Sequence, residues 1–429
     1  MRIPPFFCQL AHPLSINGVT IHAPLLNVFI GELCLLRRSV NDRTVVGRAQ
    51  VTGLNPKGTV LTLLGHNKGL GRDIVLHPTG AALSITGSDA WMGKVIDSSG
   101  RIVDRLSNHE LPEAPMCHLN INRAPVPYQL RQPLNRPLTT GIRAIDGMLT
   151  CASGQRIGIF ASAGCGKTAL LQMIIAHADA DVFVIGLIGE RGREVAEFVN
   201  ILRESEKADR TVLVFATSDY ASVDRCNAAL IATTIAEYFR DRGQQVVLLL
   251  DSVTRYARAL RDVAFSTGEL PSRRGYPASV FEALPLLLER PGCTVTGSIT
   301  AFYTILLEDE DESDAIGEEV KSILDGHIYL SRKLAGQGHF PAIDILNSTS
   351  RVFTHVADEA HQHTATGLRR LLARLADLKL YRDIGEYKPG LDRDNDMALE
   401  REPALENFLC QPTDECSRYD ETLESMNEV

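Results

Sequence analysis

The stretch Ala161–Thr168 reads ASAGCGKT, and it directly follows a short apolar run, Ile157–Phe160. A strand, a glycine-rich turn and a Lys-Thr pair that opens a helix together form a phosphate-binding loop. Gly164 and Gly166 let backbone N–H groups curl around the β- and γ-phosphates without obstruction by side chains. The pattern departs from the usual one at its first position, where Ala161 replaces the expected glycine. The motif predicts that the chain binds a nucleoside triphosphate.

Each part of this loop has an expected role. Lys167, on a solvent-open loop, would place its ammonium on the γ-phosphate, and the hydroxyl of Thr168 would ligate Mg²⁺. The amphipathic stretch Thr168–Ala178 predicts the helix whose positive dipole end faces the phosphates. The residues expected to contact the nucleotide are Ser162, Ala163, Gly164, Cys165, Gly166, Lys167, Thr168 and Ala169. ATP and Mg²⁺ are therefore the expected ligands.

Composition narrows the class of protein. The chain has 429 residues, enough for more than one domain, and its 44% hydrophobic and 23% charged residues are ordinary for a soluble globular protein. The net charge of −9 argues against bulk nucleic-acid binding. Nine cysteines occur singly, which is a reduced, cytosolic pattern. Neither a membrane-spanning run nor an N-terminal signal segment is visible, so we expect a cytoplasmic protein that docks at most on a membrane complex.

The hydrophobic patterns divide the chain into three segments. Short alternating runs such as Val45–Val51 and Thr59–Leu64, bounded by turn residues, predict a small β-barrel within residues 1–72. Apolar strands alternate with helical patterns over residues 73–352, which predicts an α/β core with a largely parallel sheet covered on both faces. The pattern then turns helical over residues 353–429. The expected strands of the core are Arg156–Phe160, Val182–Ile188, Thr211–Ala216, Val246–Asp251, Ser298–Leu306 and His327–Ser331.

Three carboxylates follow apolar strands of this core. Asp251 ends one strand, where it can reach a nucleotide-bound Mg²⁺ through water, and a helix N-cap is a compatible second role because Ser252 and a helical pattern follow. Glu190 and Glu194 follow another strand. Either could polarise the attacking water, because ATP hydrolysis depends on positioning and charge stabilisation. Spacing alone leaves both open as the catalytic carboxylate.

Two further charged features lie near the ends of core strands. Arg351 closes the string NSTSR just past the last strand, from where it could act as an arginine finger on a neighbour's γ-phosphate or form a surface salt bridge. The acidic stretch Glu308–Glu312 is the only charge run, and its plain interpretation is a solvated loop.

Taken together, these strings resemble the cytosolic ATPase of type III protein secretion systems, of the injectisome class. That family is related to the flagellar export ATPase and to the catalytic subunit of rotary ATP synthases, and the match covers nearly the whole chain. The matching strings include TGIRAIDGMLTC, FASAGCGKT, LIGERGREVAEFV, RRGYPASVF, GSITAFYT and FPAID followed by NSTSR. The resemblance implies a RecA-like P-loop core at residues 73–352, a six-stranded barrel for ring assembly at 1–72, and a helical domain at 353–429 for stalk, chaperone and substrate contacts.

The resemblance also implies roles for charged residues by position. Glu190 falls on the catalytic carboxylate of the family, Arg191 on an adjacent phosphate-contacting arginine, and Glu194 on a supporting acid near Mg²⁺. Arg351 matches the arginine finger that a neighbouring subunit inserts, so the resemblance favours this role over a surface salt bridge. Arg255 matches an arginine that supports the site.

Two phenylalanines are assigned to the base of the nucleotide in the same way. Phe340 falls on the aromatic residue that stacks on adenine, and Phe408 falls on a second wall of that pocket. Both could otherwise be plain core residues.

The implied function is ATP hydrolysis that energises type III secretion, releasing chaperones from effectors and unfolding substrates for export. The implied partners are five further copies in a homohexamer, a central coiled-coil stalk, a peripheral stator or regulator, and chaperone–effector complexes, at the cytoplasmic face of the inner-membrane export apparatus. Nucleic acid is not among them. The acidic segment Glu308–Asp314 would line the central opening and contact the stalk.

Three alternative functions compete. The first is the flagellar member of the family. The second is a rotary synthase subunit, against which the missing acidic rotor signature near Ile384–Pro389 argues. The third is an RNA-translocating helicase, which would stack bases on aromatic residues of its barrel. Phe29 is the only aromatic residue between Cys8 and Trp91, so the barrel lacks such a platform.

Overall fold

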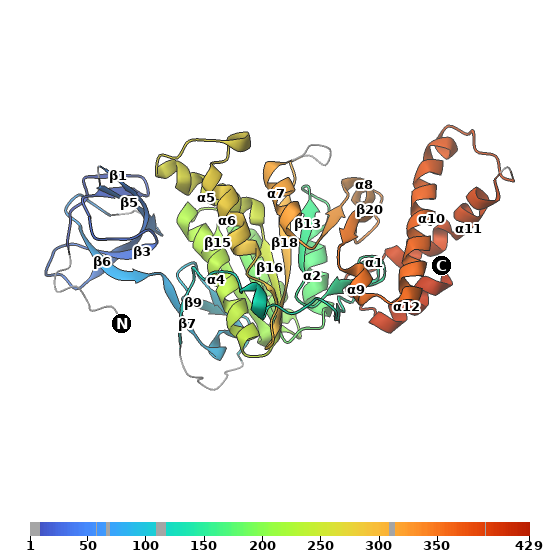
Figure 1. Ribbon diagram of the computed structural model, residues 1–429, viewed down its shortest axis with the longest axis horizontal. Helices are drawn as coiled ribbons and strands as arrows, with labels where there is room; N and C mark the ends of the chain where they lie inside the picture. Colours follow the sequence, from blue (N-terminus) through green and yellow to red (C-terminus); the bar gives the residue numbers. More distant parts are fainter. Residues whose placement is uncertain (1–8, 57, 66–68, 109–116, 309–313, 391) are drawn as a thin grey trace.

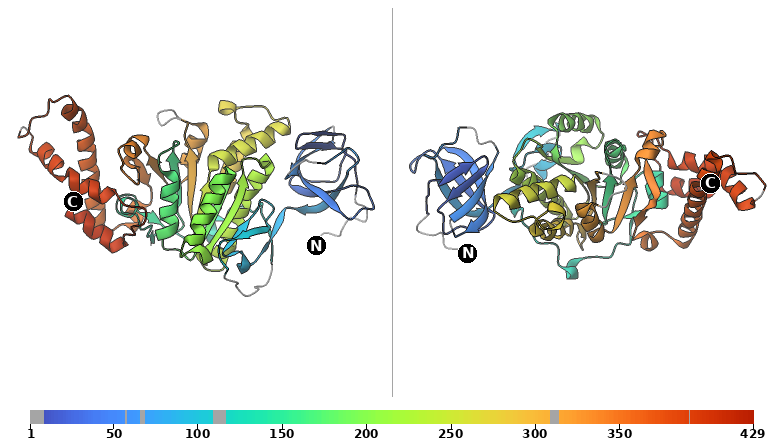
Figure 2. Two further views of the ribbon diagram at one scale, coloured as in Figure 1. Left: turned by 180° about the vertical axis from the view of Figure 1, so that it is seen from behind. Right: turned by 90° about the horizontal axis from the view of Figure 1, so that it is seen from above.

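The computed structural model describes residues 9–56, 58–65, 69–108, 117–308, 314–390 and 392–429. The chain forms three parts in a row along its longest axis, namely a barrel, a central core and a set of C-terminal helices (Figure 1). The views from behind and from above agree that the barrel and the C-terminal helices lie at opposite ends of the core (Figure 2). The expected α/β class, with a six-stranded N-terminal sheet and a helical C-terminal part, is confirmed.

Six antiparallel strands build the N-terminal barrel, in the order β1-β2-β5-β4-β3-β6. Their bounds are β1 (Ser15–Asn17), β2 (Thr20–Ala23), β3 (Glu32–Arg37), β4 (Val45–Asn55), β5 (Gly58–Leu64) and β6 (Val75–Ala82). Backbone hydrogen bonds link Ala11, which precedes β1, to Leu76 of β6. The strand β6 lies beyond residue 72, where we expected the barrel to end. Pro78 and Gly80 interrupt its alternation, which is tolerated because β6 is an edge strand.

The core contains a ten-stranded mixed sheet in the order β20-β19-β13-β18-β16-β14-β15-β8-β9, with β17 paired to β18. The strands from β19 to β8 run parallel, and β20 and β9 are antiparallel at the two edges. The six strands predicted from the sequence are all present, within two residues at each end. The bounds are β8 (Lys94–Ile96), β9 (Ile102–Arg105), β13 (Arg156–Ala161), β14 (Val182–Glu190), β15 (Thr211–Thr217), β16 (Gln245–Asp251), β17 (Gly292–Cys293), β18 (Ser298–Leu306), β19 (Gly326–Leu330) and β20 (Ile343–Ser350).

Helices cover both faces of this sheet, as the continuous apolar strands predicted. Successive residues of β14 show this, because Phe183 and Ile185 pack in one buried cluster with α1 to α3, whereas Val182 and Val184 pack in another with α4 to α7. The helices of the core are α1 (Arg143–Met148), α2 (Lys167–His177), α3 (Gly192–Glu204), α4 (Ser222–Asp241), α5 (Val253–Ser266), α6 (Ala278–Leu288), α7 (Ala315–Ile323), α8 (Arg332–Gly336) and α9 (Phe353–Val356).

Shorter elements connect these layers. The small strands β7 (Ser84–Gly87) and β10 (Cys117–Asn120) pair with each other, as do β11 (Pro137–Leu138) and β12 (Cys151–Ala152). Single 3₁₀ turns lie at Asp89–Trp91, Tyr128–Leu130, Ala208–Arg210 and Arg273–Gly275.

Among the described residues of the C-terminal part there are three helices, namely α10 (Glu359–Asp383), α11 (Arg393–Leu409) and α12 (Tyr419–Glu428). Asp358 begins α10 by accepting a hydrogen bond from the backbone N–H of His361 at 2.8 Å. Leu368 and Leu378 of α10 are buried, and Leu371, Leu372 and Leu375 are partly buried. Within the described ranges, the structure contains no helix with both the length and the apolar character needed to cross a bilayer.

Candidate nucleotide-binding site

The phosphate-binding loop connects strand β13 to α2, as predicted. Gly164 and Gly166 have φ of 85° and 80°, a left-handed conformation that residues with a Cβ rarely adopt. Gly166 is also the N-cap of α2, so the first backbone N–H groups of the helix are available to an anion. Ala161 is the last residue of β13 and is fully buried. Because its φ is not positive, an alanine fits where the usual pattern has glycine.

The remaining predicted contacts of the loop differ in exposure. Ala163 and Thr168 are exposed, Ala169 is half-buried, and Ser162 and Cys165 are buried. The Sγ of Cys165 lies 3.0 Å from the hydroxyl of Ser162, beneath the loop. The exposed side of the loop therefore offers backbone groups and the Thr168 hydroxyl, and Cys165 fills space under it.

Lys167 is enclosed by carboxylates, so our expectation of a solvent-open position is wrong. Its side chain is only 14% exposed. Its Nζ contacts Oδ1 of Asp251 and lies 3.7 Å from Oε1 of Glu190. In the absence of phosphates, the ammonium balances two nearly buried negative charges.

Asp251 is the last residue of β16, and its carboxylate faces the loop rather than the following helix. Besides Lys167, it accepts a hydrogen bond from the hydroxyl of Thr304 at 2.7 Å. The N-cap of α5 is Ser252, whose Oγ accepts a hydrogen bond from the backbone N–H of Arg255 at 3.3 Å. The two roles that the sequence left open for Asp251 thus fall on two residues, and the Asp251 carboxylate remains at the phosphate loop.

Glu190 and Glu194 differ sharply in their surroundings. Glu190 ends β14, its side chain is 6% exposed, and its carboxylate forms an ion pair with Arg255. Glu194 lies in the first turn of α3 and is 47% exposed. Arg191 is 81% exposed and its Nε lies 3.8 Å from Glu194. The geometry favours Glu190 as the carboxylate that meets the γ-phosphate, and it places Arg191 on the outer surface.

A cavity of about 220 Å³ joins most of these residues. It is lined by Lys167, Thr168, Gln172, Leu187, Glu190, Glu194, Glu197, Phe198, Ile201, Asp251 and Arg255. The apolar wall formed by Leu187, Phe198 and Ile201 was not predicted from the sequence, and neither was the hydroxyl of Thr304. These residues look like ordinary core or strand residues until the parallel strands bring them together. The role of Arg255 as a support of the site agrees with its ion pair to Glu190.

The residues of the cavity fit a Mg²⁺ ion that arrives with the nucleotide. No group of three or more His, Cys, Asp or Glu side chains among the described residues could hold a metal by itself. Mg²⁺ is commonly bound by one or two protein ligands together with substrate phosphates and water. Such an ion would bind inside the cavity, which is lined by the hydroxyl of Thr168 and the carboxylates of Asp251 and Glu194.

The two phenylalanines assigned to the base lie in different surroundings. Phe340 is 42% exposed and lies over the phosphate loop, since a Cβ built on Gly166 would be 3.1 Å from its ring. Phe408 is only 3% exposed and packs among Leu405 and Leu409 of α11 in the buried cluster that includes α1. Its ring has no open face for a base, so the prediction that Phe408 forms a second wall of the pocket is wrong. Phe340 is the available aromatic surface.

Arg351 lies near the amino-terminal ends of the parallel strands, whereas the phosphate loop of its own chain lies near their carboxyl-terminal ends. Ser350 pairs with Gly326, and Gly326 pairs with Ile157, at the start of β13. The loop follows the other end of β13, roughly 13 Å away at about 3.3 Å per strand residue. The guanidinium of Arg351 is exposed and donates to the carbonyl of Lys321 at 3.2 Å. It can contact a nucleotide only if that nucleotide is bound to another subunit.

The acidic segment that we expected at a central opening lies mostly outside the described residues, which stop at Glu308 and resume at Asp314. Glu308 pairs with Arg258 at 2.7 Å, and Asp314 accepts a hydrogen bond from Gly317 at the start of α7. The stalk contact of this segment stays a prediction.

Comparisons with known families match the core and the C-terminal part of the chain. The nucleotide-binding domain of the ATP synthase alpha/beta family matches residues 141–350, and the C-terminal domain of EscN-type type III secretion ATPases matches residues 357–428. The SPI-1 type 3 secretion system ATPase of Salmonella typhi is 57% identical over 427 residues, which cover 100% of this chain and 99% of that protein. The flagellum-specific ATP synthase of Treponema pallidum is 39% identical, over 97% of this chain and 92% of that protein.

Solved structures agree with these matches. The assembled ATPase EscN from the type III secretion system of enteropathogenic E. coli has a TM-score of 0.90 and 43% identity, over 97% of this chain and 99% of that chain. EscN in complex with its central stalk EscO has a TM-score of 0.87 and 42% identity, over 97% of this chain and 99% of that chain. With the phosphate loop, the buried Glu190 and the three-part architecture in place, the chain belongs to the family of type III secretion system ATPases.

Proposed function

We propose that this chain hydrolyses Mg·ATP in a homohexameric ring at the cytoplasmic face of the inner-membrane export apparatus, and that hydrolysis energises type III protein secretion. The observation that carries the proposal is the burial of Glu190 between Lys167 and Arg255 at the phosphate loop, in a chain 57% identical to a secretion ATPase over its whole length. A carboxylate held in this way is suited to orient the water that attacks the γ-phosphate.

Each residue of the site would act by positioning and charge. Lys167 would leave Asp251 to contact the β- and γ-phosphates, and the N–H groups at the start of α2 would bind them from below. The bound Mg²⁺ supplies charge neutralisation on the phosphate oxygens. Glu190 keeps its ion pair with Arg255, which fixes its orientation toward the water. Phe340 would stack on the adenine.

The ring is part of the proposal because Arg351 cannot serve its own site. One structure of the related EscN is that of the assembled ATPase, and a second shows EscN with its central stalk. We extend both features to this chain: Arg351 of one subunit would reach the γ-phosphate in the next, and a coiled-coil stalk would occupy the centre. Chaperone–effector complexes, whose chaperones would be released and effectors unfolded, and a peripheral stator complete the proposed partners.

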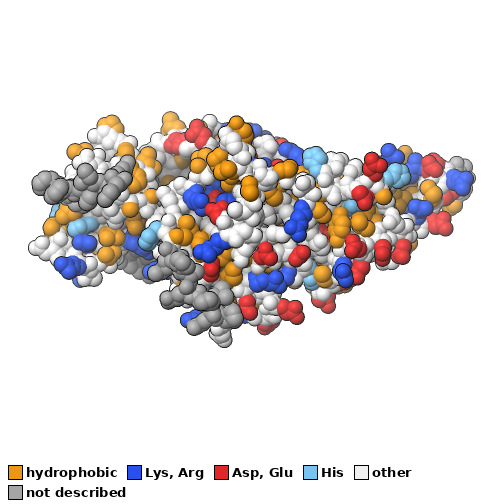
Figure 3. All heavy atoms as spheres, turned by 60° about the horizontal axis from the view of Figure 1, so that its bottom comes forward, with side chains coloured by type: hydrophobic (Ala, Val, Ile, Leu, Met, Phe, Trp, Pro, Cys, Tyr) orange, Lys and Arg blue, Asp and Glu red, His pale blue; other side chains and the backbone are white. Residues whose placement is uncertain are grey.

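The charged surface does not favour nucleic acid as a substrate. Figure 3 shows one face of the molecule, on which Lys and Arg side chains lie among Asp and Glu side chains rather than in one continuous band. The net charge of −9 points the same way.

Replacing Glu190 with Gln in the bacterium that carries this gene tests the proposal. Purified Glu190→Gln protein should bind ATP but hydrolyse it poorly, and the strain should no longer release effectors into the medium. Glu197→Gln is the matched control, since Glu197 lines the outer part of the same cavity and is 56% exposed. Normal effector release by the Glu190→Gln strain would contradict the proposal. Lost swimming with intact effector release would assign the chain to flagellar export instead.

A further inference from the structure

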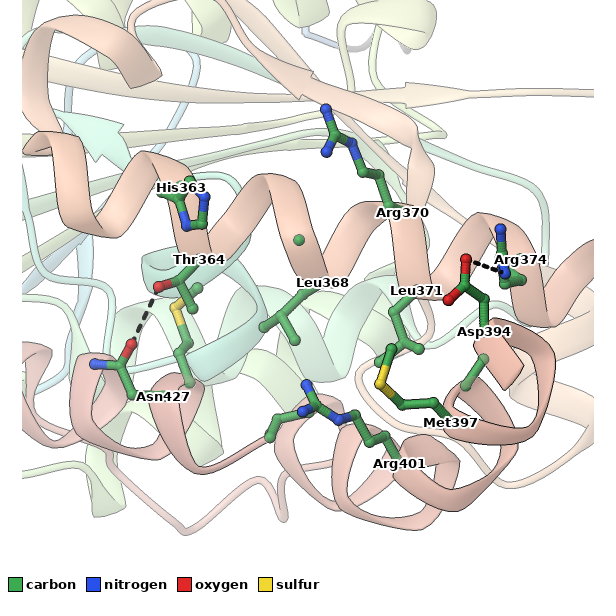
Figure 4. A pocket seen from close by; sticks show the side chains of 14 residues that line it. His363, Thr364, Leu368, Arg370, Leu371, Arg374, Asp394, Met397, Arg401 and Asn427 are labelled. Atoms are coloured by element: carbon green, nitrogen blue, oxygen red, sulfur yellow. Dashed lines mark hydrogen bonds and ion pairs between the residues drawn. The ribbon is translucent and has the colours of Figure 1, made fainter. Parts of the chain in front are cut away.

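A groove of about 500 Å³ lies between the C-terminal helices, away from the nucleotide cavity. It separates α10 from α11 and α12, and fourteen residues line it (Figure 4). Leu368 and Leu371 point from α10 toward α11, and Met397 points from α11 toward Leu371. Met397 is 44% exposed, so part of this apolar surface is in contact with solvent. An exposed apolar groove between helices is a common site for another protein's helix.

One face of α10 forms the long wall of the groove. The lining residues of this helix recur every three or four positions from His363 to Arg374, which is the spacing of a single helical face. That face is roughly 16 Å long, at 1.5 Å per residue. The groove therefore has the length of about three turns of a helix lying along it.

Gly367 lies in the middle of this helical face and leaves it without a side chain at that point. A Cβ built on it would meet nothing within 4 Å, and its φ is not positive, so neither packing nor backbone conformation requires glycine. A glycine in a helix interior costs about 1 kcal/mol relative to alanine. The missing side chain instead leaves open space in the groove.

The charged side chains of the groove are mostly cationic, in a chain whose net charge is −9. Arg374 and Arg401 line it, Arg370 borders it, and Asp394 is the one acidic side chain among the fourteen lining residues. Asp394 is already paired with Arg374 at 3.2 Å. Figure 4 shows Arg401 projecting from α11 toward the leucines of α10, whereas Arg370 points away from the groove. Arg401 is thus the cation best placed to meet an incoming group.

We propose that this groove is a docking site for an acidic amphipathic helix of a partner protein. Its apolar side chains would pack on Leu371 and Met397 and cross the wall at Gly367, and its carboxylates would pair with Arg401. The sign of the charge distinguishes this site from the predicted acidic stalk contact, which would attract a basic coiled coil. The inference rests on the proposed function only in taking the partner to be a protein.

Fluorescence anisotropy with two designed peptides tests the site. One labelled peptide carries leucines along one helical face, flanked by Glu, and the second carries Lys in place of every Glu. The full-length protein should bind the acidic peptide at least about tenfold more tightly than the basic one, and the difference should shrink at high salt. Arg401→Glu should weaken acidic-peptide binding by about tenfold. Arg393→Glu, on the same helix outside the groove, should leave it unchanged.

Gly367→Leu provides a second, independent variant. It should block the groove and weaken binding, while the melting temperature stays at or above that of the wild type because helix propensity rises. Thr366→Leu, the adjacent position outside the groove, is its control. Basal ATP hydrolysis should be normal in all four variants, so a failure of the proposed function would show in hydrolysis and not in peptide binding.

Two results would overturn the inference. The first is equal binding of the two peptides, or undiminished binding of the acidic peptide by both Arg401→Glu and Gly367→Leu. The second is a change in ring assembly, seen by sedimentation, without a change in peptide binding, which would make the groove an interface between copies of this chain.

Discussion

Replacing Lys167 with methionine should destabilise the nucleotide-free protein as well as abolish hydrolysis. The side chains of Lys167 and Asp251 are 14% and 9% exposed, so the change leaves a nearly buried carboxylate without its cation. Removing one partner of a buried ion pair typically costs about 3–5 kcal/mol. Asp251 keeps its hydrogen bond from Thr304, and Glu190 keeps Arg255, so we expect a smaller loss, about 1–3 kcal/mol.

A double-mutant cycle measures this interaction. Thermal unfolding of wild type, Lys167→Met, Asp251→Asn and the double variant is followed without nucleotide. Lys167→Met alone should lower the melting temperature, by about 2–4 °C per kcal/mol for a domain of this size. In the double variant the unpaired charge is gone, so part of the stability should return, with a coupling free energy of about 1–3 kcal/mol. Lys388→Met, at an exposed lysine, is the control.

A coupling free energy near zero would refute this reasoning. It would mean that water or the neighbouring hydroxyl already compensates Asp251, and that Lys167 acts only on bound phosphates. Hydrolysis is expected to be lost in either case, so the unfolding data alone decide the matter.

Four other variants test the catalytic carboxylate, the adenine contact and the pH dependence of stability. Glu190→Gln should lower kcat by about a hundredfold or more and Glu194→Gln far less, in steady-state hydrolysis; the reverse order would make Glu194 the catalytic carboxylate. Phe340→Ser should raise KM for ATP by about tenfold with little change in kcat, because a stacked base contributes about 1–3 kcal/mol; an unchanged KM would remove Phe340 from the adenine site. Burial lowers the pKa of His327 to about 4, so stability should be complete above pH 6.5 and fall between pH 6.5 and 4. In His327→Gln, the melting temperature should depend less on pH between pH 6.5 and 4 than in the wild type. A dependence as steep as that of the wild type would exclude His327 as its source.

Much of the core could be predicted because its signals are local. The phosphate loop and the apolar strands that end in Glu190 and Asp251 each carry their pattern in a few consecutive residues. Parallel strands bring their carboxyl ends to one edge of the sheet, so the meeting of these residues followed from the alternation of strands and helices. The predicted end of the barrel at residue 72 was wrong because the signal for β6 is not local. This strand has an irregular sequence and pairs with β3, which lies much earlier in the chain.

The sequence could not show which side chains are buried or in which direction they point. Phe408 and Phe340 are both aromatic residues near the ends of elements, and only packing shows that one is enclosed while the other lies over Gly166. Likewise, the pattern placed Lys167 on a loop but not between two carboxylates. Glu190 and Glu194 follow the same strand, and the sequence does not show that Glu190 is buried while Glu194 is exposed.

Mixing two inactive variants tests whether Arg351 of a neighbouring subunit completes each active site. The Lys167→Ala protein should be nearly inactive because it lacks the cation that contacts the phosphates. The Arg351→Ala protein should also be nearly inactive, since an arginine finger contributes about 10³–10⁵ in rate. In rings assembled from equal amounts of both, about a quarter of the interfaces would pair an intact Lys167 with an intact Arg351. Hydrolysis should return in these mixed rings. No recovery, in rings shown by two affinity tags to contain both variants, would contradict it.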